Sequence, residues 1–409
     1  MVQSARTLSA VTVCAAMFAM VASGVGAAEK KYAPGVTDSE IKLGQTMPYS
    51  GNASAFGIVG RIQAAYFKMI NARGGVNGRR INLVSLDDGF SPPKTVEQIR
   101  RLVEEEKVYA IFGSVGTPPN IAIAKYLNTQ AVPHLLFSSG APRWADPANT
   151  PWSLPFYVQQ DIEAAIYARY LAADTPGAKI AVLYQNDEFG KGYLAGFRAG
   201  LGDKAAAMIV KEAGYELSDA TIDSQLFQLK ASGADTLFSA STPKFAAQTI
   251  RRLAEMGWKP RHVVIAAGNS VSATLRPAGV ENAVGMLTSV FLKAPDDRAW
   301  ADDAAMQAYL AFMKEWAPNE PAGDLTPVLA YMTSELMVGL LAKCGDDLSR
   351  EKLMAVATDL EGTQLPLMLP GIKLSITPKS YTSFRQAVMA RFDGTDWKPF
   401  GGPVSADGR

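Results

Sequence analysis

The sequence predicts an α/β fold of two doubly wound lobes, and three observations lead to that prediction. Segments rich in β-branched and leucine residues alternate with segments whose apolar residues recur at helical spacing. This alternation occurs in two successive series along the chain. At 409 residues the chain is also too long for one comfortable core. Regular strand–helix units predict parallel sheets with right-handed crossovers, so each series should form one lobe.

The first series lies between residues 41 and 138. Its β-branched and leucine-rich runs predict strands at 41–46, 80–86, 110–113 and 134–138. Helical spacing of apolar residues predicts helices at 57–72, 92–107 and 118–129. Pro92 stands in the first turn of the second of these helices, where its missing N–H is tolerated.

The second series follows the region of Trp152 and Pro155. Strands are expected at 179–184, 208–211, 236–239 and 263–266, and helices at 160–173, 191–201, 221–232 and 243–256. After residue 292 the pattern changes to three long helices at 297–316, 325–344 and 349–360. The segment 384–400 alternates, with Asp393-Gly394 as a hairpin turn. We expect this tail to pack back onto the two lobes, because repeated crossings between lobes would form a hinge.

The first 28 residues predict a cleaved secretory signal. Arg6 supplies the positive start, Leu8 to Val21 is an apolar run, and small residues end at Ala28. A membrane anchor is the alternative, but the run is shorter than the roughly 20 residues a span needs. Elsewhere the longest apolar run, Val328 to Ala342, contains Glu335, so the mature protein is expected to be soluble and periplasmic.

Composition argues against several classes of function. Without Arg6 the basic residues number 39, which equals the 39 acidic residues, so binding to nucleic acid or to an anionic membrane is not expected. Cys344 is the only cysteine after the signal, so no internal disulfide is expected. The two histidines, His134 and His262, start apolar strands. Phosphate-binding, dinucleotide, metal and nucleophile motifs are not found. We therefore predict a protein that is not an enzyme, with no catalytic residues, no cofactor and no metal.

Polar and small residues follow several predicted strands, where ligands of doubly wound sheets bind. In the first lobe the segment after residue 112 contains Ser114, Gly116 and Thr117, and the next strand ends at Ser138, Ser139 and Gly140. Glycines and a helix N-terminus favour a carboxylate here. The alternative is that Ser114, Thr117 and Asn120 only cap the helix. The second lobe offers Phe189, Ser241, and the pair Gly268 and Asn269 at its strand ends.

The order of these motifs resembles the branched-chain amino-acid-type (Leu/Ile/Val-binding) periplasmic solute-binding proteins of ABC importers. The resemblance covers essentially the whole mature chain. The matching strings are Ile41-Lys-Leu-Gly44, Ser50-Gly51 with Phe56-Gly57, Ile70-Asn-Ala-Arg-Gly-Gly-Val-Asn-Gly78, Asp87-Asp88, Tyr109-Ala-Ile-Phe-Gly113 and Tyr184-Gln-Asn-Asp-Glu-Phe-Gly190.

The resemblance implies a type I periplasmic binding protein, with Rossmann-like lobes joined by a three-crossing hinge. The N-terminal lobe would comprise residues 29–157 and 291–361, and the C-terminal lobe residues 158–290 and 362–409. The resemblance also implies a monomer that captures a small solute in the interlobe cleft by domain closure and delivers it to an ABC permease in the inner membrane.

Carried over onto this sequence, the family's pocket places a hydroxyl on the ligand carboxylate at Thr117, beside Ser138, Ser139 and Gly140. Phe56 and Phe189 stand where amino-acid binders often carry aromatic side chains. Where those binders present an acidic residue to the ligand's ammonium, this sequence has Gly268, followed by Asn269.

An unpartnered buried ammonium costs several kcal/mol, in order of magnitude. We therefore expect a carboxylate with an aromatic or apolar body rather than an α-amino acid. Gln45-Thr-Met-Pro-Tyr-Ser-Gly51 and Asp146-Pro-Ala-Asn-Thr-Pro-Trp152 also resemble members of the family associated with aromatic acids from plant material. Uptake of branched-chain or other amino acids, and ligand sensing for a signalling partner, stay open as alternatives.

Overall fold

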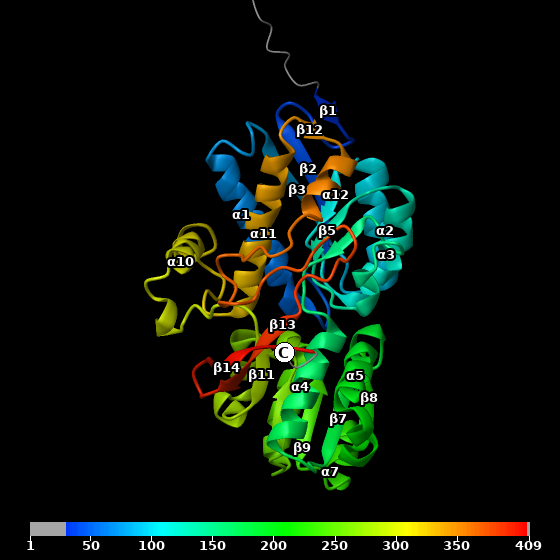
Figure 1. The fold of residues 1–409 in the computed structure, drawn as a ribbon, viewed down its shortest axis with the longest axis vertical. Coiled ribbons are helices and arrows are strands. Elements are labelled where there is room, and N and C mark those ends of the chain that lie inside the picture. The colour runs from blue at the N-terminus through cyan, green and yellow to red at the C-terminus, as the bar shows by residue number, and fades with distance from the viewer. Residues whose placement is uncertain (1–29, 407–409) are drawn as a thin grey trace, which may run out of the picture.

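Two α/β lobes make up the protein in the computed structural model, which describes residues 30–406 (Figure 1). The predicted signal segment lies outside the described residues. The first lobe is built on a five-stranded sheet of order β3-β2-β4-β5-β6, parallel throughout. Its strands are β2 (Glu40–Met47), β3 (Arg80–Asp87), β4 (Ala110–Phe112), β5 (His134–Phe137) and β6 (Ser153–Pro155). Its helices are α1 (Gly57–Ala72), α2 (Pro92–Arg100), α3 (Thr117–Thr129), α10 (Ala304–Trp316), α11 (Leu325–Cys344) and α12 (Arg350–Ala357).

The second lobe is built on a seven-stranded sheet of order β14-β13-β11-β10-β9-β7-β8. Its strands are β7 (Ile180–Gln185), β8 (Ile209–Tyr215), β9 (Thr236–Ala240), β10 (Arg261–Val264), β11 (Leu287–Val290), β13 (Gln386–Phe392) and β14 (Trp397–Ser405). Its helices are α4 (Gln160–Asp174), α5 (Glu188–Leu201), α6 (Ala205–Met208), α7 (Asp223–Ala231), α8 (Pro243–Glu255) and α9 (Arg276–Ala278). β13 pairs antiparallel with β11 and with β14, so the predicted hairpin extends an otherwise parallel sheet.

The chain crosses between the lobes three times, as the predicted fold class requires. It crosses after β6, returns after β11 to form α10 to α12, and crosses again before β13. A short pair of strands, β1 (Lys31–Tyr32) and β12 (Asp347–Leu348), joins the start of the first lobe to this returning segment. The predicted lobe boundaries stay predictions. Within the segment assigned to the second lobe from residue 362, Tyr381 and Ser383 hydrogen-bond to Ala145 and Pro155 of the first lobe.

Most predicted elements are present, and the two largest differences in extent concern helices. The helix predicted from residue 297 begins at Ala304, because the Asp303 carboxylate accepts the Met306 amide and caps the helix there. The helix predicted over 92–107 is α-helical only to Arg100 and ends in one π-turn, Arg101–Glu105. The histidines lie in β5 and β10, both buried, as expected of ordinary strand positions.

Helix α11 completes the core of the first lobe. Among the described residues it is the one helix whose length and apolar composition would suffice to cross a membrane. It packs against α1 instead, and the rings of Tyr66 and Tyr331 meet edge to face with centroids 4.9 Å apart. Most of its apolar side chains, including Val328, Leu336 and Leu340, are buried within the protein. It is therefore a core helix of this lobe (Figure 1).

Helices α4 and α5 pack unusually close together in the second lobe. Gly192, Gly196 and Gly200 recur every four residues on α5 and face α4. A Cβ on Gly196 would lie 2.5 Å from the Asp161 Cα, so only glycine permits this approach. The contact fixes the start of α4, including Gln160, whose side chain reaches into the first lobe.

Candidate functional site

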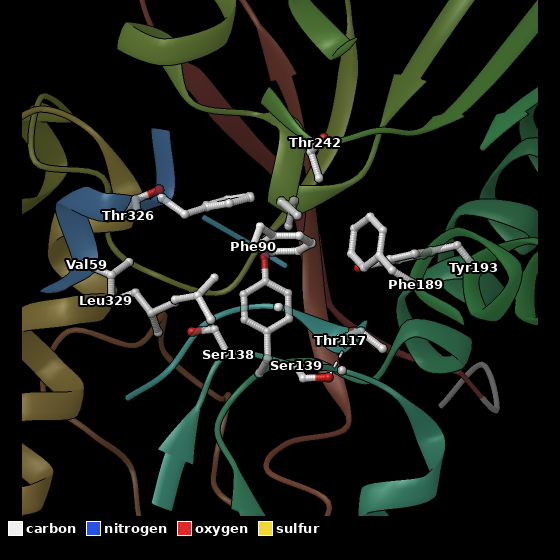
Figure 2. Close-up of a pocket in the computed structure, with 17 residues that line it drawn as sticks. Val59, Phe90, Thr117, Ser138, Ser139, Phe189, Tyr193, Thr242, Thr326 and Leu329 are labelled. Atoms are coloured by element: carbon white, nitrogen blue, oxygen red, sulfur yellow. Dashed lines mark hydrogen bonds between the residues drawn. The ribbon is translucent and has the colours of Figure 1, made fainter. Parts of the chain in front are cut away.

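A cavity of about 680 Å³, open solvent included, lies between the two lobes. The carboxyl ends of β4 and β5 contribute one side of it, and those of β7, β9 and β10 contribute the other, as expected for doubly wound sheets. Seven of the eleven predicted site residues line it together: Phe56, Gly116, Thr117, Ser138, Ser139, Gly140 and Phe189. Figure 2 shows Thr117, Ser138 and Ser139 on one side of the cavity and Thr242, from the other lobe, on the opposite side.

The polar side of the cavity is centred on a pair of hydroxyls. Thr117 Oγ1 and Ser139 Oγ are 2.9 Å apart, and both side chains are almost fully buried. The Trp144 indole N–H donates to Ser139 Oγ at 2.9 Å, and Gln160 Nε2 donates to Thr117 Oγ1 at 3.1 Å. Both hydroxyls are thus already acceptors. One of the two hydroxyl hydrogens forms the hydrogen bond between Thr117 and Ser139. The other hydroxyl hydrogen is therefore available to a ligand oxygen.

Two further hydroxyls are available in the cavity. Among the described residues, neither Ser138 Oγ nor the Tyr157 phenol has a hydrogen-bond partner, and both residues line the cavity. Tyr157 was not predicted from the sequence, because it lies in the first lobe crossing, outside any strand end. Three hydroxyl hydrogens, from Ser138, Tyr157 and the Thr117–Ser139 pair, are sufficient to satisfy a carboxylate without a cation.

The N-terminus of helix α3 offers fewer free backbone N–H groups to a ligand than the sequence suggested. Helix α3 begins at Thr117 and continues with Pro118 and Pro119, which have no N–H. The Asn120 amide donates to the Gly116 carbonyl at 3.2 Å. Among the described residues of this first turn, only the Thr117 amide is left for a ligand. The hydroxyls therefore supply more of the polar surface than the backbone does.

Aromatic and aliphatic side chains form the other walls. Phe90 was missed by the sequence reasoning. It has a left-handed φ of 61° after the Asp87-Asp88 strand end, and its ring lies over Gly116. A Cβ on Gly116, whose φ is 110°, would lie 2.4 Å from the Phe90 ring. Glycine is thus required for this contact. The remaining lining residues that were missed are Val59, Val115, Tyr193, Thr242, Ala266, Ala267, Thr326 and Leu329.

A buried carboxyl stands behind the wall on the second lobe. Glu163 on α4 accepts hydrogen bonds from the Tyr193 hydroxyl at 2.6 Å, the Tyr167 hydroxyl at 2.6 Å and the Ala266 amide at 2.8 Å. Ser289 Oγ adds a fourth at 3.1 Å. Tyr193 and Ala266 both line the cavity, so Glu163 fixes two of its wall positions. Burial raises the pKa of the Glu163 carboxyl.

Four predicted site residues do not line this cavity. Ser114 is buried beneath it, donating to Asn120 Oδ1 at 2.8 Å and lying 2.7 Å from His134 Nε2. Ser241 and Gly268 pack against each other, and a Cβ on Gly268 would lie 2.6 Å from the Ser241 carbonyl oxygen. Asn269 faces a neighbouring cavity instead. An acidic side chain could therefore not occupy position 268 without a backbone shift.

The lining is free of charge. Among the 17 described residues that surround the cavity, none is acidic, basic or histidine. The described part of the chain also contains no cluster of three or more His, Cys, Asp or Glu that could hold a metal ion. The site can therefore bind a ligand by hydroxyl hydrogen bonds and apolar contact.

Comparison with known proteins identifies the type of molecule. A family model described as periplasmic binding protein matches residues 40–393. Leu/Ile/Val-binding protein homolog 7 of Brucella abortus is 27% identical over 257 residues, which cover 61% of this chain and 63% of that protein. The match thus spans less than two thirds of that relative's length.

Solved structures share the fold at low sequence identity. A branched-chain amino acid ABC transporter protein from Thermus thermophilus with bound valine has a TM-score of 0.81 at 16% identity, covering 90% of this chain and 97% of its own. An ABC transporter solute binding protein from R. palustris in complex with benzoate has a TM-score of 0.76 at 20% identity, covering 90% and 98%. Both likenesses concern the fold alone.

Proposed function

The chain belongs to the periplasmic binding protein family, and on that premise we propose that it captures a small monocarboxylate with an aromatic or apolar body. As the sequence predicted, it is a binding protein and not an enzyme. In this proposal the two lobes close on the solute in the periplasm. The protein, acting as a monomer, then delivers the solute to an ABC permease in the inner membrane.

The observation that supports this ligand class is the uncharged lining of the cavity. A zwitterionic amino acid would bring a buried ammonium with no acidic side chain to meet it. Glu163, the carboxyl behind the wall, already accepts hydrogen bonds from four donors. A carboxylate, in contrast, meets the Ser138 and Tyr157 hydroxyls and the Thr117–Ser139 pair. Phe56, Phe90 and Phe189 surround the rest of the ligand.

Uptake of a branched-chain amino acid is the second candidate, because the Brucella relative is named for Leu, Ile and Val and the Thermus structure holds valine. The uncharged lining argues against it. An unpaired ammonium in such a cavity costs several kcal/mol in order of magnitude, because its lost hydration is not replaced.

Thermal unfolding of the purified protein with added ligands tests the proposal. Benzoate or cinnamate should raise the melting temperature, because a ligand at about 100 times its Kd stabilises the folded state by about 2.7 kcal/mol. Leucine and valine at the same concentration should leave it unchanged. A rise with leucine and none with the aromatic acids would overturn the proposed ligand class.

A further inference from the structure

A second cavity adjoins the first on its α11 side. It has a volume of about 320 Å³, open solvent included, and shares four lining residues with the main cavity: Tyr157, Ala266, Thr326 and Leu329. In Figure 2, Thr326 and Leu329 lie on the opposite side of the main cavity from Phe189 and Tyr193. The second cavity therefore continues the main one away from that aromatic pair. We call it the side chamber.

The side chamber leads on towards the surface at the β13–β14 hairpin. A third cavity, of about 370 Å³ with open solvent included, shares Asn269, Val290, Leu292 and Leu325 with it. At its far end this third cavity is lined by Trp397 and Asp396 of the hairpin. The three cavities thus share walls in series, between the end of β11 and the first turn of α11.

The walls of the side chamber are mostly apolar. Val290, Phe291, Leu292 and Leu329 are buried, with exposed fractions of 3%, 5%, 3% and 7%. The Phe291 ring meets the Tyr157 ring edge to face at 5.8 Å. A charged group would lose its hydration here without compensation, whereas a hydrocarbon chain would be favoured.

Tyr157 and Thr326 also line the main cavity, and the two polar residues that line the side chamber beyond them, Ser289 and Asn269, already have partners. Ser289 Oγ is held in the Glu163 and Tyr167 network, and the Asn269 carbonyl accepts the Trp397 indole N–H at 2.7 Å. Asp324, at the third cavity, accepts the amides of Val271 and Ser272. These groups gain nothing from a polar ligand, so the chamber selects for apolar content.

We propose that the side chamber holds the apolar tail of a ligand whose carboxylate is bound at Thr117 and Ser139. The inference rests on the proposed function and narrows its substrate class to monocarboxylic acids with an extended alkyl or arylalkyl chain. Burial of each further methylene should tighten binding about fourfold. The increase should end when the chain fills the chamber.

Calorimetric titration of the full-length mature protein with benzoate and with straight-chain acids from butanoate to decanoate tests the inference. Affinity should rise with chain length to a maximum. Leu325→Trp fills the chamber from the first turn of α11, and residue 325 does not line the main cavity. The variant should therefore lose the increase in affinity for long acids and keep its affinity for benzoate. Leu310→Trp adds the same indole at an exposed position of α10 and is the matched control. It should change neither the affinity for long acids nor the affinity for benzoate.

Leu325→Ala provides a second measurement, which stands even where the tryptophan variant does not fold. It widens the chamber, so the best-binding acid should become longer. The inference is wrong if benzoate binds but longer acids bind no tighter, or if the chain length of the tightest-binding acid is the same in the parent and in both Leu325 variants. In either case the side chamber holds no tail, while the proposed function stands. If no carboxylate binds the parent protein, the proposed function fails, and the inference fails with it.

Discussion

At the scale of single residues, Glu163 is the most unusual group in the second lobe. Its carboxyl is fully buried, and the titratable side chains that face it are tyrosines: Tyr157, Tyr167 and Tyr193. Among the described residues no lysine, arginine or histidine contacts it. Four donors replace part of the lost hydration, yet burial still raises its pKa. The protonated carboxyl is therefore favoured in the folded protein relative to the unfolded chain.

This shift predicts a pH dependence of stability. Above the ordinary glutamate pKa of 4.5, the unfolded chain releases the Glu163 proton while the folded protein retains it. The free energy of unfolding should therefore fall as pH rises from there through the raised pKa, by at most about 1.4 kcal/mol per pH unit. Glu163→Gln imitates the protonated group and should remove this slope. Urea denaturation of both proteins at several pH values measures it.

The control for this prediction is Glu361→Gln, at an exposed position. It should leave the slope of the parent protein intact. Equal slopes for the parent and Glu163→Gln would show that the buried carboxyl does not titrate in this range.

The site residues differed in how well the sequence could predict them. Thr117, Ser138 and Ser139 follow strands of one parallel sheet, whose carboxyl ends meet at one edge, so their meeting was predictable. Tyr157 and Thr326 reach the cavity from a crossing and from the start of α11. No local pattern marks those positions, because only the return of the chain brings α11 to the first lobe.

At the scale of secondary-structure elements, the contact of α4 with α5 couples packing to the site. The glycines of α5 let α4 approach, and the first residue of α4, Gln160, donates to Thr117 Oγ1. A change in the spacing of the two helices would move this donor. The orientation of the hydroxyl pair therefore depends on a helix contact in the other lobe.

Gly196→Ala should destabilise the protein although alanine favours helices. The added Cβ would lie 2.5 Å from the Asp161 Cα, and such overpacking costs about 1–3 kcal/mol against a helix-propensity gain of about 1 kcal/mol. Gly339→Ala in α11 is the matched control, because nothing lies within 4 Å of its Cβ position. It should stabilise the protein by up to about 1 kcal/mol. Chemical denaturation compares the two, and a stable Gly196→Ala would refute the close contact.

Alternation and helical spacing predicted the longer elements, because both lobes are regular strand–helix series, but they did not predict the short elements β1, β6, β12, α6 and α9. The late start of α10 has a local cause. Asp303 caps α10, which begins seven residues after the predicted start, since the intervening stretch, from Asp297, forms turns and a short 3-10 helix. The boundary could not be read from apolar spacing alone, because spacing does not reveal which of several aspartates accepts the first helical amide.

At the scale of the whole molecule, the lobes also contact each other directly at the mouth of the cleft. Asn52 of the first lobe donates to the Leu217 carbonyl at 2.7 Å, and Lys244 donates to Asn52 Oδ1 at 3.1 Å. On the hinge side, Asp324, which precedes α11, accepts amides from Val271 and Ser272 of the second lobe. Both contacts join the two lobes directly.

Asn52→Ala should speed ligand release without changing the lining of the cavity. The neutral bond to Leu217 and the exposed bond from the Lys244 ammonium each contribute about 1 kcal/mol, so the loss of both should raise the dissociation rate up to about 30-fold. Stopped-flow measurement with the best-binding carboxylate checks this. Asn282→Ala is the control, since its amide donates within the second lobe to the Ala278 carbonyl. If the two variants release ligand equally fast, Asn52 does not hold the cleft closed.

The return of α11 to α1 also determines when the first lobe is completed during synthesis. Residues 31–155 provide all the strands of its main sheet, but the helix that covers α1 is not made until residues 325–344 emerge. A nascent chain ending after β6 would lack Phe312 and Tyr331, whose rings pack on Tyr66, and would expose the Tyr66 ring to water. The lobe that starts first is therefore finished after the core strands of the second, and a chain shortened before residue 325 should be degraded or aggregate rather than accumulate as a separate domain.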